Sequence, residues 1–169
     1  ATGLLILCTG KHTKQIPFIQ DAPKTYTGTI TLGATTPSYD LETKINATFP
    51  TTHITPELIE EIRLQFIGEL TQAPPLFSAI KKDGKRLYEL ARKGEITEIS
   101  PRNITIHSLN LVPYTEKELS FEVHCSKGTY IRSLAHDIGK ALGSGAYLSS
   151  LRRTHIGVHS VENALSPDT

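Results

Sequence analysis

The residues best suited to chemistry lie where a predicted strand meets a predicted helix, in residues 125–139 (CSKGTYIRSLAHDIG). Lys127, Tyr130 and Arg132 fall at this junction. The unpaired N–H groups of a first helical turn attract anions, and a lysine and an arginine beside them strengthen a preference for phosphate or carboxylate. Tyr130 adds a flat face that can also form a hydrogen bond. The alternative is structural: a solvated lysine, a tyrosine at the rim of the core, and an arginine paired with a structural acid.

Further aromatic and cationic residues suit the binding of nucleic acid. Tyr26 stands in a strand-like stretch, where it could stack under a base or simply pack within a sheet. The other cations are the basic patch of Lys81, Lys82, Lys85 and Arg86, and the pair Arg152 and Arg153. RNA is read mainly at unpaired bases, so a splayed-out nucleotide could be held by an aromatic and cationic set on several segments: Tyr26, Tyr88, Tyr130, Arg132, Lys127 and Arg152. A solvated hairpin tip and an ordinary charged surface explain the same residues.

Sequence motifs for several other chemistries are absent. The sequence has no phosphate loop, no G-x-S-x-G elbow, no HExxH and no GxGxxG. Its seven histidines lack the spacing of zinc ligands, so we expect no metal site. Cys8 and Cys125 lie far apart without a CxxC pattern, which indicates reduced thiols and a cytoplasmic setting.

The composition is that of one globular domain. A chain of 169 residues, 38% hydrophobic and 21% charged, can bury a single core without disulfides or metals. No apolar run approaches the roughly 18 residues that cross a bilayer, so we expect no membrane partner. The net charge of +1 limits any nucleic-acid site to a local basic patch. Because methionine is absent and the sequence starts at Ala1, we expect that an amino-terminal segment has been lost.

Hydrophobic periodicity predicts the strands and helices that position these residues. Residues 24–33 and 118–125 alternate as half-buried strands, and a further alternating stretch precedes the second of them. Helical spacing predicts helices at about 56–70, 86–93 and 131–142. We therefore predict an α+β fold, a mixed and mainly antiparallel β-sheet with flanking helices, in one domain over residues 1–169.

Four segments together resemble the TruB-type tRNA pseudouridine synthases. They are YTGTITLGATTPSYD, QAPPLFSAIKKDGKRLYELARKG, CSKGTYIRSLAHDIG and LRRTHIG, in the family's order and at compatible spacing. The resemblance covers nearly the whole chain. It implies a pseudouridine synthase fold and the isomerisation of the T-loop uridine at tRNA position 55 to pseudouridine, with no cofactor and no metal. The implied partner is the T stem-loop of tRNA, and we expect a monomer.

The resemblance also assigns roles to individual residues. Tyr26 matches the tyrosine that stacks on the target base, Arg132 the arginine that pairs with the catalytic aspartate, and Tyr130 its neighbour in the pocket. Leu151 matches the apolar residue of the pocket wall, and Asp40 matches an acid in a nearby loop. The other expected substrate contacts are Lys127, Lys81, Lys85, Arg86 and Arg152. In the family an aspartate attacks as nucleophile on a flipped-out base, and a neighbouring arginine keeps such an acid ionised.

The chain departs from the family pattern at two places. The aspartate-bearing G-T-L-D-P segment of the family would lie just before Ala1, so we expect this chain alone to be inactive. The family's T-x-T-x-D pattern is Thr36-Pro37-Ser38-Tyr39-Asp40 here. After LRRTHIG no separate C-terminal RNA-binding domain is seen. The alternative function is a non-catalytic RNA-binding module that uses the same cleft and basic hairpin.

Overall fold

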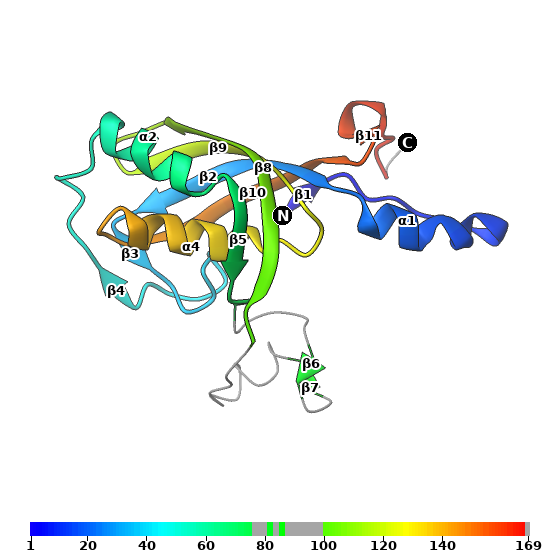
Figure 1. The fold of residues 1–169 in the computed structure, drawn as a ribbon, viewed down its shortest axis with the longest axis horizontal. Helices are drawn as coiled ribbons and strands as arrows, with labels where there is room; N and C mark the ends of the chain where they lie inside the picture. The colour runs from blue at the N-terminus through cyan, green and yellow to red at the C-terminus, as the bar shows by residue number, and fades with distance from the viewer. Residues whose placement is uncertain (76–80, 83–84, 87–99, 168–169) are drawn as a thin grey trace.

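A seven-stranded sheet lies at the centre of the computed structural model, which describes residues 1–75, 81–82, 85–86 and 100–167 (Figure 1). The strand order is β1-β10-β2-β9-β8-β5, and β11 pairs with β10. The bounds are β1 (Thr2–Gly3), β2 (Lys24–Leu32), β5 (Gly68–Gln72), β8 (Arg102–Pro113), β9 (Glu118–Cys125), β10 (Ala146–Ile156) and β11 (His159–Ser160). Short β1 runs parallel to β10, and the other pairs are antiparallel. The predicted mixed, mainly antiparallel sheet is confirmed.

Two helices cover one face of this sheet, α2 (Pro56–Gln65) and α4 (Ile131–Ala141) (Figure 1). Their apolar stripes pack against the inward side chains of the central strands and form the hydrophobic core. Ile138 of α4 is fully buried, and Gly139 beside it lets the helix approach β10 closely. A Cβ at Gly139 would lie 2.4 Å from the Cβ of Ala146. Close packing against β10 therefore fixes the position of α4, the helix that carries Arg132.

Helix α2 begins where predicted but ends earlier than the predicted residue 70. The Thr55 hydroxyl accepts a hydrogen bond from the Leu58 N–H at 3.2 Å, and Pro56 follows it in the first turn. The helix ends at Gln65, and Gly68, with a φ of +106°, does not have helical geometry. The residues from Gly68 to Gln72 pair with β8, so Leu70 of the predicted helical stripe belongs to strand β5.

The basic hairpin is present as two short strands, β6 (Lys81–Lys82) and β7 (Lys85–Arg86), paired antiparallel. Arg86 therefore lies in a strand, and the rest of the helix predicted at about 86–93 lies outside the described residues. Two further short strands, β3 (Ala34–Thr35) and β4 (Ala47–Thr48), pair beside the main sheet.

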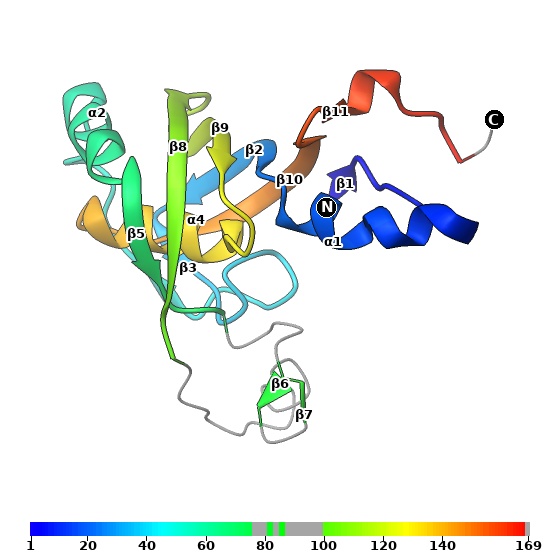
Figure 2. The same cartoon turned by 45° about the vertical axis from the view of Figure 1, so that its right-hand side comes forward.

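The first residues of the chain and its last described residues lie together at one end of the sheet, away from α2 (Figure 2). A 3-10 helix (Gly10–Gln15) carries Lys11, His12 and Lys14, and it continues into α1 (Ile16–Asp21). A second 3-10 helix (Val161–Asn163) follows β11. Several apolar side chains of this end are exposed, among them Leu7 at 82% and Val158 at 94%.

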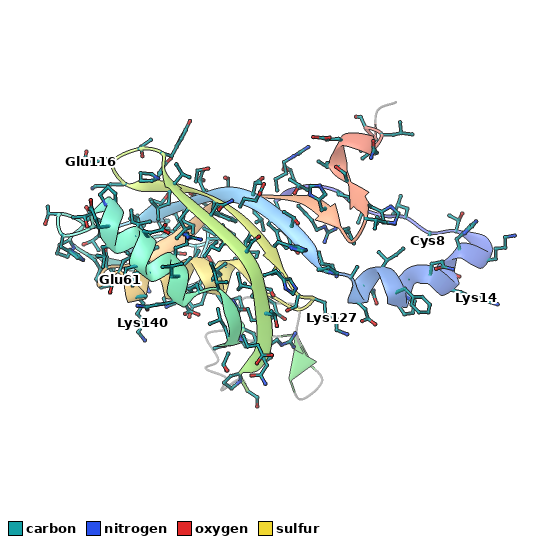
Figure 3. All side chains as sticks on the ribbon, turned by 45° about the horizontal axis from the view of Figure 1, so that its top comes forward. Cys8, Lys14, Glu61, Glu116, Lys127 and Lys140 are labelled. Carbon is teal, nitrogen blue, oxygen red and sulfur yellow. The ribbon has the colours of Figure 1, made fainter. Side chains whose placement is uncertain are left out.

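The two thiols occupy contrasting environments. Cys125 has no exposed surface, and burial raises the pKa of its thiol to about 11, although a hydrogen bond with Thr129 acts in the opposite direction. Cys8 is only partly buried, on the N-terminal segment (Figure 3). The reactive form of a thiol is the thiolate, so the native protein should react with a thiol reagent at pH 8 through Cys8 alone. One equivalent should be consumed before unfolding and two after it, and rapid reaction of both native thiols would contradict this description.

Candidate active site

A β-bulge in β10 decides which of its side chains face the core. The cross-strand pairs are Leu148 with Ile30, Leu151 with Gly28, and Arg153 with Tyr26. Strict alternation from the buried Leu148 would put Ser150 on the core-facing side, but the bulge between Leu148 and Ser150 adds one residue to the strand. Leu151 and Arg153 consequently lie on the same face as Leu148, because residues directly opposite each other share a face of the sheet.

The bulge depends on a glycine in the neighbouring strand. A Cβ at Gly28 would lie 2.1 Å from the carbonyl oxygen of Ser150 and 2.9 Å from the Phe121 ring. Opposite the bulge, the Thr29 hydroxyl lies 2.9 Å from the Ser149 hydroxyl and 2.8 Å from that of Ser150. Two serines therefore share one threonine partner, which stabilises the extra residue in place.

Tyr26 and Leu151 line a cavity of about 450 Å³ together with Arg153 and the first five residues of the chain. Burial is the main cause that raises the pKa of the Tyr26 phenol, and a hydrogen bond with the Arg153 guanidinium partly opposes it. The phenol is therefore neutral at physiological pH and offers an uncharged aromatic face. Arg153 is held in turn by two hydrogen bonds to the Leu4 carbonyl, at 2.9 and 2.8 Å.

Arg132 and Asp40 line a second cavity, of about 320 Å³, which Leu151 and Ala1 also border. Arg132 is the second residue of α4. Its Nη1 lies 3.7 Å from Asp40 Oδ2 and donates a hydrogen bond to the Ser38 carbonyl at 3.4 Å. The two side chains are 22% and 26% exposed, so the guanidinium keeps access to the cavity. Leu151 and Ala1 border both cavities, which joins the two halves of the site.

The loop of residues 36–43 fixes Asp40 through a hydrogen-bond network. Asp40 Oδ1 accepts a hydrogen bond from the Ser38 hydroxyl at 2.6 Å and another from the Glu42 N–H at 2.9 Å. The Thr36 hydroxyl donates to the Asp40 carbonyl at 2.7 Å. Ser38, whose hydroxyl belongs to this network, is completely buried. These hydrogen bonds hold the Asp40 carboxylate in place beside Arg132.

Tyr39 of the same loop stacks on His136 of α4. The ring centroids lie 3.9 Å apart at an interplanar angle of 14°, and Tyr39 has a φ of +66°. The Tyr39 carbonyl also accepts a hydrogen bond from the Leu148 N–H at 2.8 Å. Among the described residues, nothing forms a hydrogen bond with His136 Nδ1. The stack ties the loop that carries Asp40 to the helix that carries Arg132.

The stability of this stack should depend on pH. Burial, with a smaller contribution from Lys140, lowers the pKa of His136, so the unfolded chain binds a proton at pH values where the folded protein does not. The contribution of His136 to the free energy of unfolding is therefore at its maximum above about pH 6.5, the pKa of an unperturbed histidine. It decreases as the pH falls below that value. Urea unfolding of His136→Phe should show a weaker loss of stability between about pH 7 and pH 5 than the parent protein. The exposed His155→Phe is the control, and equal pH dependence of both variants would contradict the assignment.

The structure puts other expected site residues away from these two cavities. The Tyr130 ring lies under the Arg102 guanidinium, 5.4 Å from it. Lys127 forms an ion pair with Asp21 at 2.6 Å and points away from the sheet (Figure 3). It also borders a separate cavity of about 550 Å³ beside β5 and β8. The expected anion site at the strand-to-helix junction is thus divided: Lys127 faces one acid and Arg132 another.

Arg152 borders neither of the two cavities. Arg152 is exposed and donates a hydrogen bond to the Thr2 hydroxyl at 3.3 Å. The side chains of Lys81, Lys85 and Arg86 lie outside the described residues. Among the arginines of β10, the one that lines a cavity with Tyr26 is Arg153, which the sequence interpretation did not select. The available signal was Gly28, because a glycine inside a β-branched strand often marks a bulge.

Two further findings apply to all the described residues. They contain no group of three or more His, Cys, Asp or Glu side chains that could hold a metal ion. Within the same residues no helix is long and apolar enough to cross a membrane.

Comparison with solved structures shows which class of protein has this fold. A crystal structure of a Cbf5–Nop10–Gar1 complex matches 93% of this chain and 38% of its own chain, with a TM-score of 0.65 and 26% identity. A structure of an H/ACA RNP bound to a substrate RNA containing 2′-deoxyuridine matches at a TM-score of 0.58 and 23% identity, covering 89% of this chain and 33% of that chain. The fold is that of the pseudouridine synthases.

Sequence comparison then gives the family. The model described as TruB family pseudouridylate synthase (N terminal domain) matches residues 1–131, and that of the tRNA pseudouridylate synthase B C-terminal domain matches residues 132–166. The chain is 59% identical over 165 residues to tRNA pseudouridine synthase B of Flavobacterium johnsoniae and 53% identical over 169 residues to that of Phocaeicola vulgatus. It covers 72% of each relative, and these relatives cover 98% and 100% of it. The protein belongs to the TruB family of pseudouridylate synthases, as the resemblance predicted.

The boundary between the two family models falls inside α4, between Ile131 and Arg132. Strand β10, in the second matched region, pairs with β2, in the first. The two regions are therefore joined in one sheet, and Arg132 and Leu151 from the second region meet Tyr26 and Asp40 from the first.

Proposed function

We propose that this protein converts the uridine at position 55, in the T loop of tRNA, into pseudouridine. The observation that carries the proposal is the shared wall of the two cavities. Leu151 lines one cavity together with Tyr26 and the other together with the Arg132–Asp40 pair. A planar base that rests on Tyr26 and Leu151 would have its ribose within reach of groups held by Arg132. An aromatic face beside an apolar wall suits an unstacked, flipped-out base.

The reaction requires no oxidant or reductant. The bond between N1 and C1′ of the uridine breaks, the uracil turns, and a bond forms between C5 and C1′. The C5 hydrogen leaves as a proton, and N1 gains a proton. A carboxylate nucleophile can hold the reacting part of the nucleoside in a covalent intermediate during this exchange.

We infer that the nucleophilic carboxylate is carried by residues directly before Ala1 in the full-length protein. Ala1 borders both cavities, and the parallel pairing of Thr2 with Arg152 and of Gly3 with Arg153 holds the start of this chain against β10. A side chain a few residues upstream of Ala1 would therefore lie close to Arg132. Asp40 is less suited to attack, because its Oδ1 already accepts two hydrogen bonds and its Oδ2 pairs with Arg132.

Arg132 would orient this carboxylate and keep it ionised. A guanidinium has five N–H donors, and the Ser38 carbonyl and Asp40 engage only Nη1. The remaining donors can hold a second carboxylate, and such pairing lowers a carboxyl pKa by about 1 to 3 units. The exposed Arg152 and Lys127, together with Lys81, Lys85 and Arg86 of the β6–β7 hairpin, would contact the tRNA backbone.

The proposal is tested by mapping pseudouridine in an unmodified tRNA transcript after incubation with the full-length protein. Pseudouridine should form at position 55, and a transcript with cytidine at that position should remain unmodified. Salt-sensitive binding without any pseudouridine would instead support the alternative, a non-catalytic RNA-binding module. Pseudouridine at a different position would overturn the assignment of the substrate.

A further inference from the structure

Gln72 forms two hydrogen bonds with the backbone of one distant residue. It is the last residue of β5 and only 2% exposed. Its Oε1 accepts a hydrogen bond from the Tyr130 N–H at 3.0 Å, and its Nε2 donates one to the Tyr130 carbonyl at 3.2 Å. The side-chain amide thus pairs with both peptide groups of Tyr130 as a neighbouring strand would. We call this pair the Gln72 clamp.

The clamp lies where helix α4 begins. Tyr130 is the N-cap residue, with φ −92° and ψ 109°, and its own side chain makes no capping hydrogen bond. Its carbonyl also accepts the first helical hydrogen bond, from the Leu134 N–H at 3.1 Å. A second hydrogen bond follows, one residue after Gln72 and three residues after Tyr130, in which the Ser133 hydroxyl donates to the Ala73 carbonyl at 2.8 Å. The first turn of α4 is consequently attached to the end of β5 at two points.

Arg132 lies between these two points of attachment. Its contacts are long, 3.4 Å to the Ser38 carbonyl and 3.7 Å to Asp40, so a small displacement of the first turn would break them. Misplacing a catalytic group by about 1 Å can cost on the order of 100-fold in rate. We propose that Gln72 is a positioning residue, which sets the entry of α4 and thereby the reach of Arg132 into the pocket. The kinetic part of this inference rests on the proposed function.

The test compares Gln72→Leu with Leu70→Ala in the full-length protein. Gln72→Leu keeps approximate volume but removes both hydrogen bonds to Tyr130. Leu70→Ala removes a half-buried side chain from the same strand without changing the clamp, so it serves as a control for lost stability. We expect Gln72→Leu to lower kcat by about 10- to 100-fold with a change in KM below about 3-fold, and Leu70→Ala to keep kcat near the parent value. Equal kcat values for the two variants would overturn the proposal.

Gln72→Glu adds a readout that a merely structural role would not alter. A protonated glutamic acid can both accept from the Tyr130 N–H and donate to its carbonyl, whereas the ionised form can only accept. The kcat of Gln72→Glu, relative to the parent protein, should therefore rise as the pH falls. The same relative kcat at all pH values would argue against the clamp, even if Gln72→Leu failed to fold.

A measurement that does not depend on activity separates this inference from the proposed function. Hydrogen exchange of the Tyr130 amide should be at least about 10-fold faster in Gln72→Leu than in Leu70→Ala, because only the first variant removes its acceptor. Unchanged exchange would overturn the clamp whatever the enzyme does. If the parent protein formed no pseudouridine, the proposed function would fail, and faster exchange would still support the attachment of α4 by Gln72.

Discussion

Replacing Arg132 with alanine is expected to lower kcat for pseudouridine formation about 1,000-fold in the full-length protein, a loss of about 4 kcal/mol of transition-state stabilisation. The reason is electrostatic and geometric: the variant loses the cation that holds the reacting carboxylate ionised and in place. Binding of tRNA should change by less than about 5-fold, because the proposed contacts with the tRNA backbone involve other residues. Single-turnover kinetics with a T stem-loop RNA would measure kcat, and a binding titration would measure affinity.

Arg63→Ala is the matched control for this prediction. Arg63 is another half-buried arginine, 21% exposed against 22% for Arg132, and it also donates to a backbone carbonyl, that of Leu109 at 2.9 Å. It lies on α2, so its loss should reduce stability without reducing kcat. If Arg132→Ala retained activity within about 10-fold of the parent, about 1.4 kcal/mol, the role assigned to Arg132 would be wrong.

Replacing Tyr26 with leucine is expected to lower kcat/KM about 10- to 100-fold for a different reason. Stacking of a base on an aromatic ring contributes about 1 to 3 kcal/mol, and leucine fills part of the volume without offering a flat face. Tyr26 is held within β2 opposite Arg153, so the change should leave the sheet intact. Steady-state kinetics with the same T stem-loop would measure the loss, and thermal unfolding would check the fold.

Tyr26→Phe separates stacking from the chemistry of the hydroxyl group. Phenylalanine keeps the ring and loses only the hydrogen bond with Arg153, so kcat/KM should stay within about 5-fold of the parent value. Equal losses in Tyr26→Leu and Tyr26→Phe would show that the hydroxyl, and not the aromatic face, carries the function.

Much of the fold could be predicted from periodicity. Strand β2 and helix α4 lie within one residue of their predicted bounds, because alternation and helical spacing report directly on which side chains face the core. The predicted end of α2 was wrong, because Leu70 fits the helical spacing by chance. Its true environment is set by pairing with Ile104 across the sheet, a contact between segments distant in the sequence.

The candidate site shows where local patterns stop being informative. The pairing of Arg132 with an acid was one of two alternatives at the junction, and the structure gives it Asp40 as a partner. Simple alternation favours Arg152 over Arg153, because it cannot anticipate the bulge before Ser150. Gln72 could not be identified at all, since its role depends on a contact with Tyr130 that spans 58 positions. Such contacts follow from tertiary packing and leave no periodic trace.

The most direct test of the central claim is the structure of the full-length protein bound to a T stem-loop RNA. The uracil of position 55 should lie outside the loop stack, with its ring against Tyr26, its edge against Leu151 and its ribose near Arg132. A target base that remains stacked within the T loop would contradict the account. Occupation of the cavity beside β5 and β8, next to Lys127, would contradict it equally, because that cavity is separate from the two that Leu151 joins.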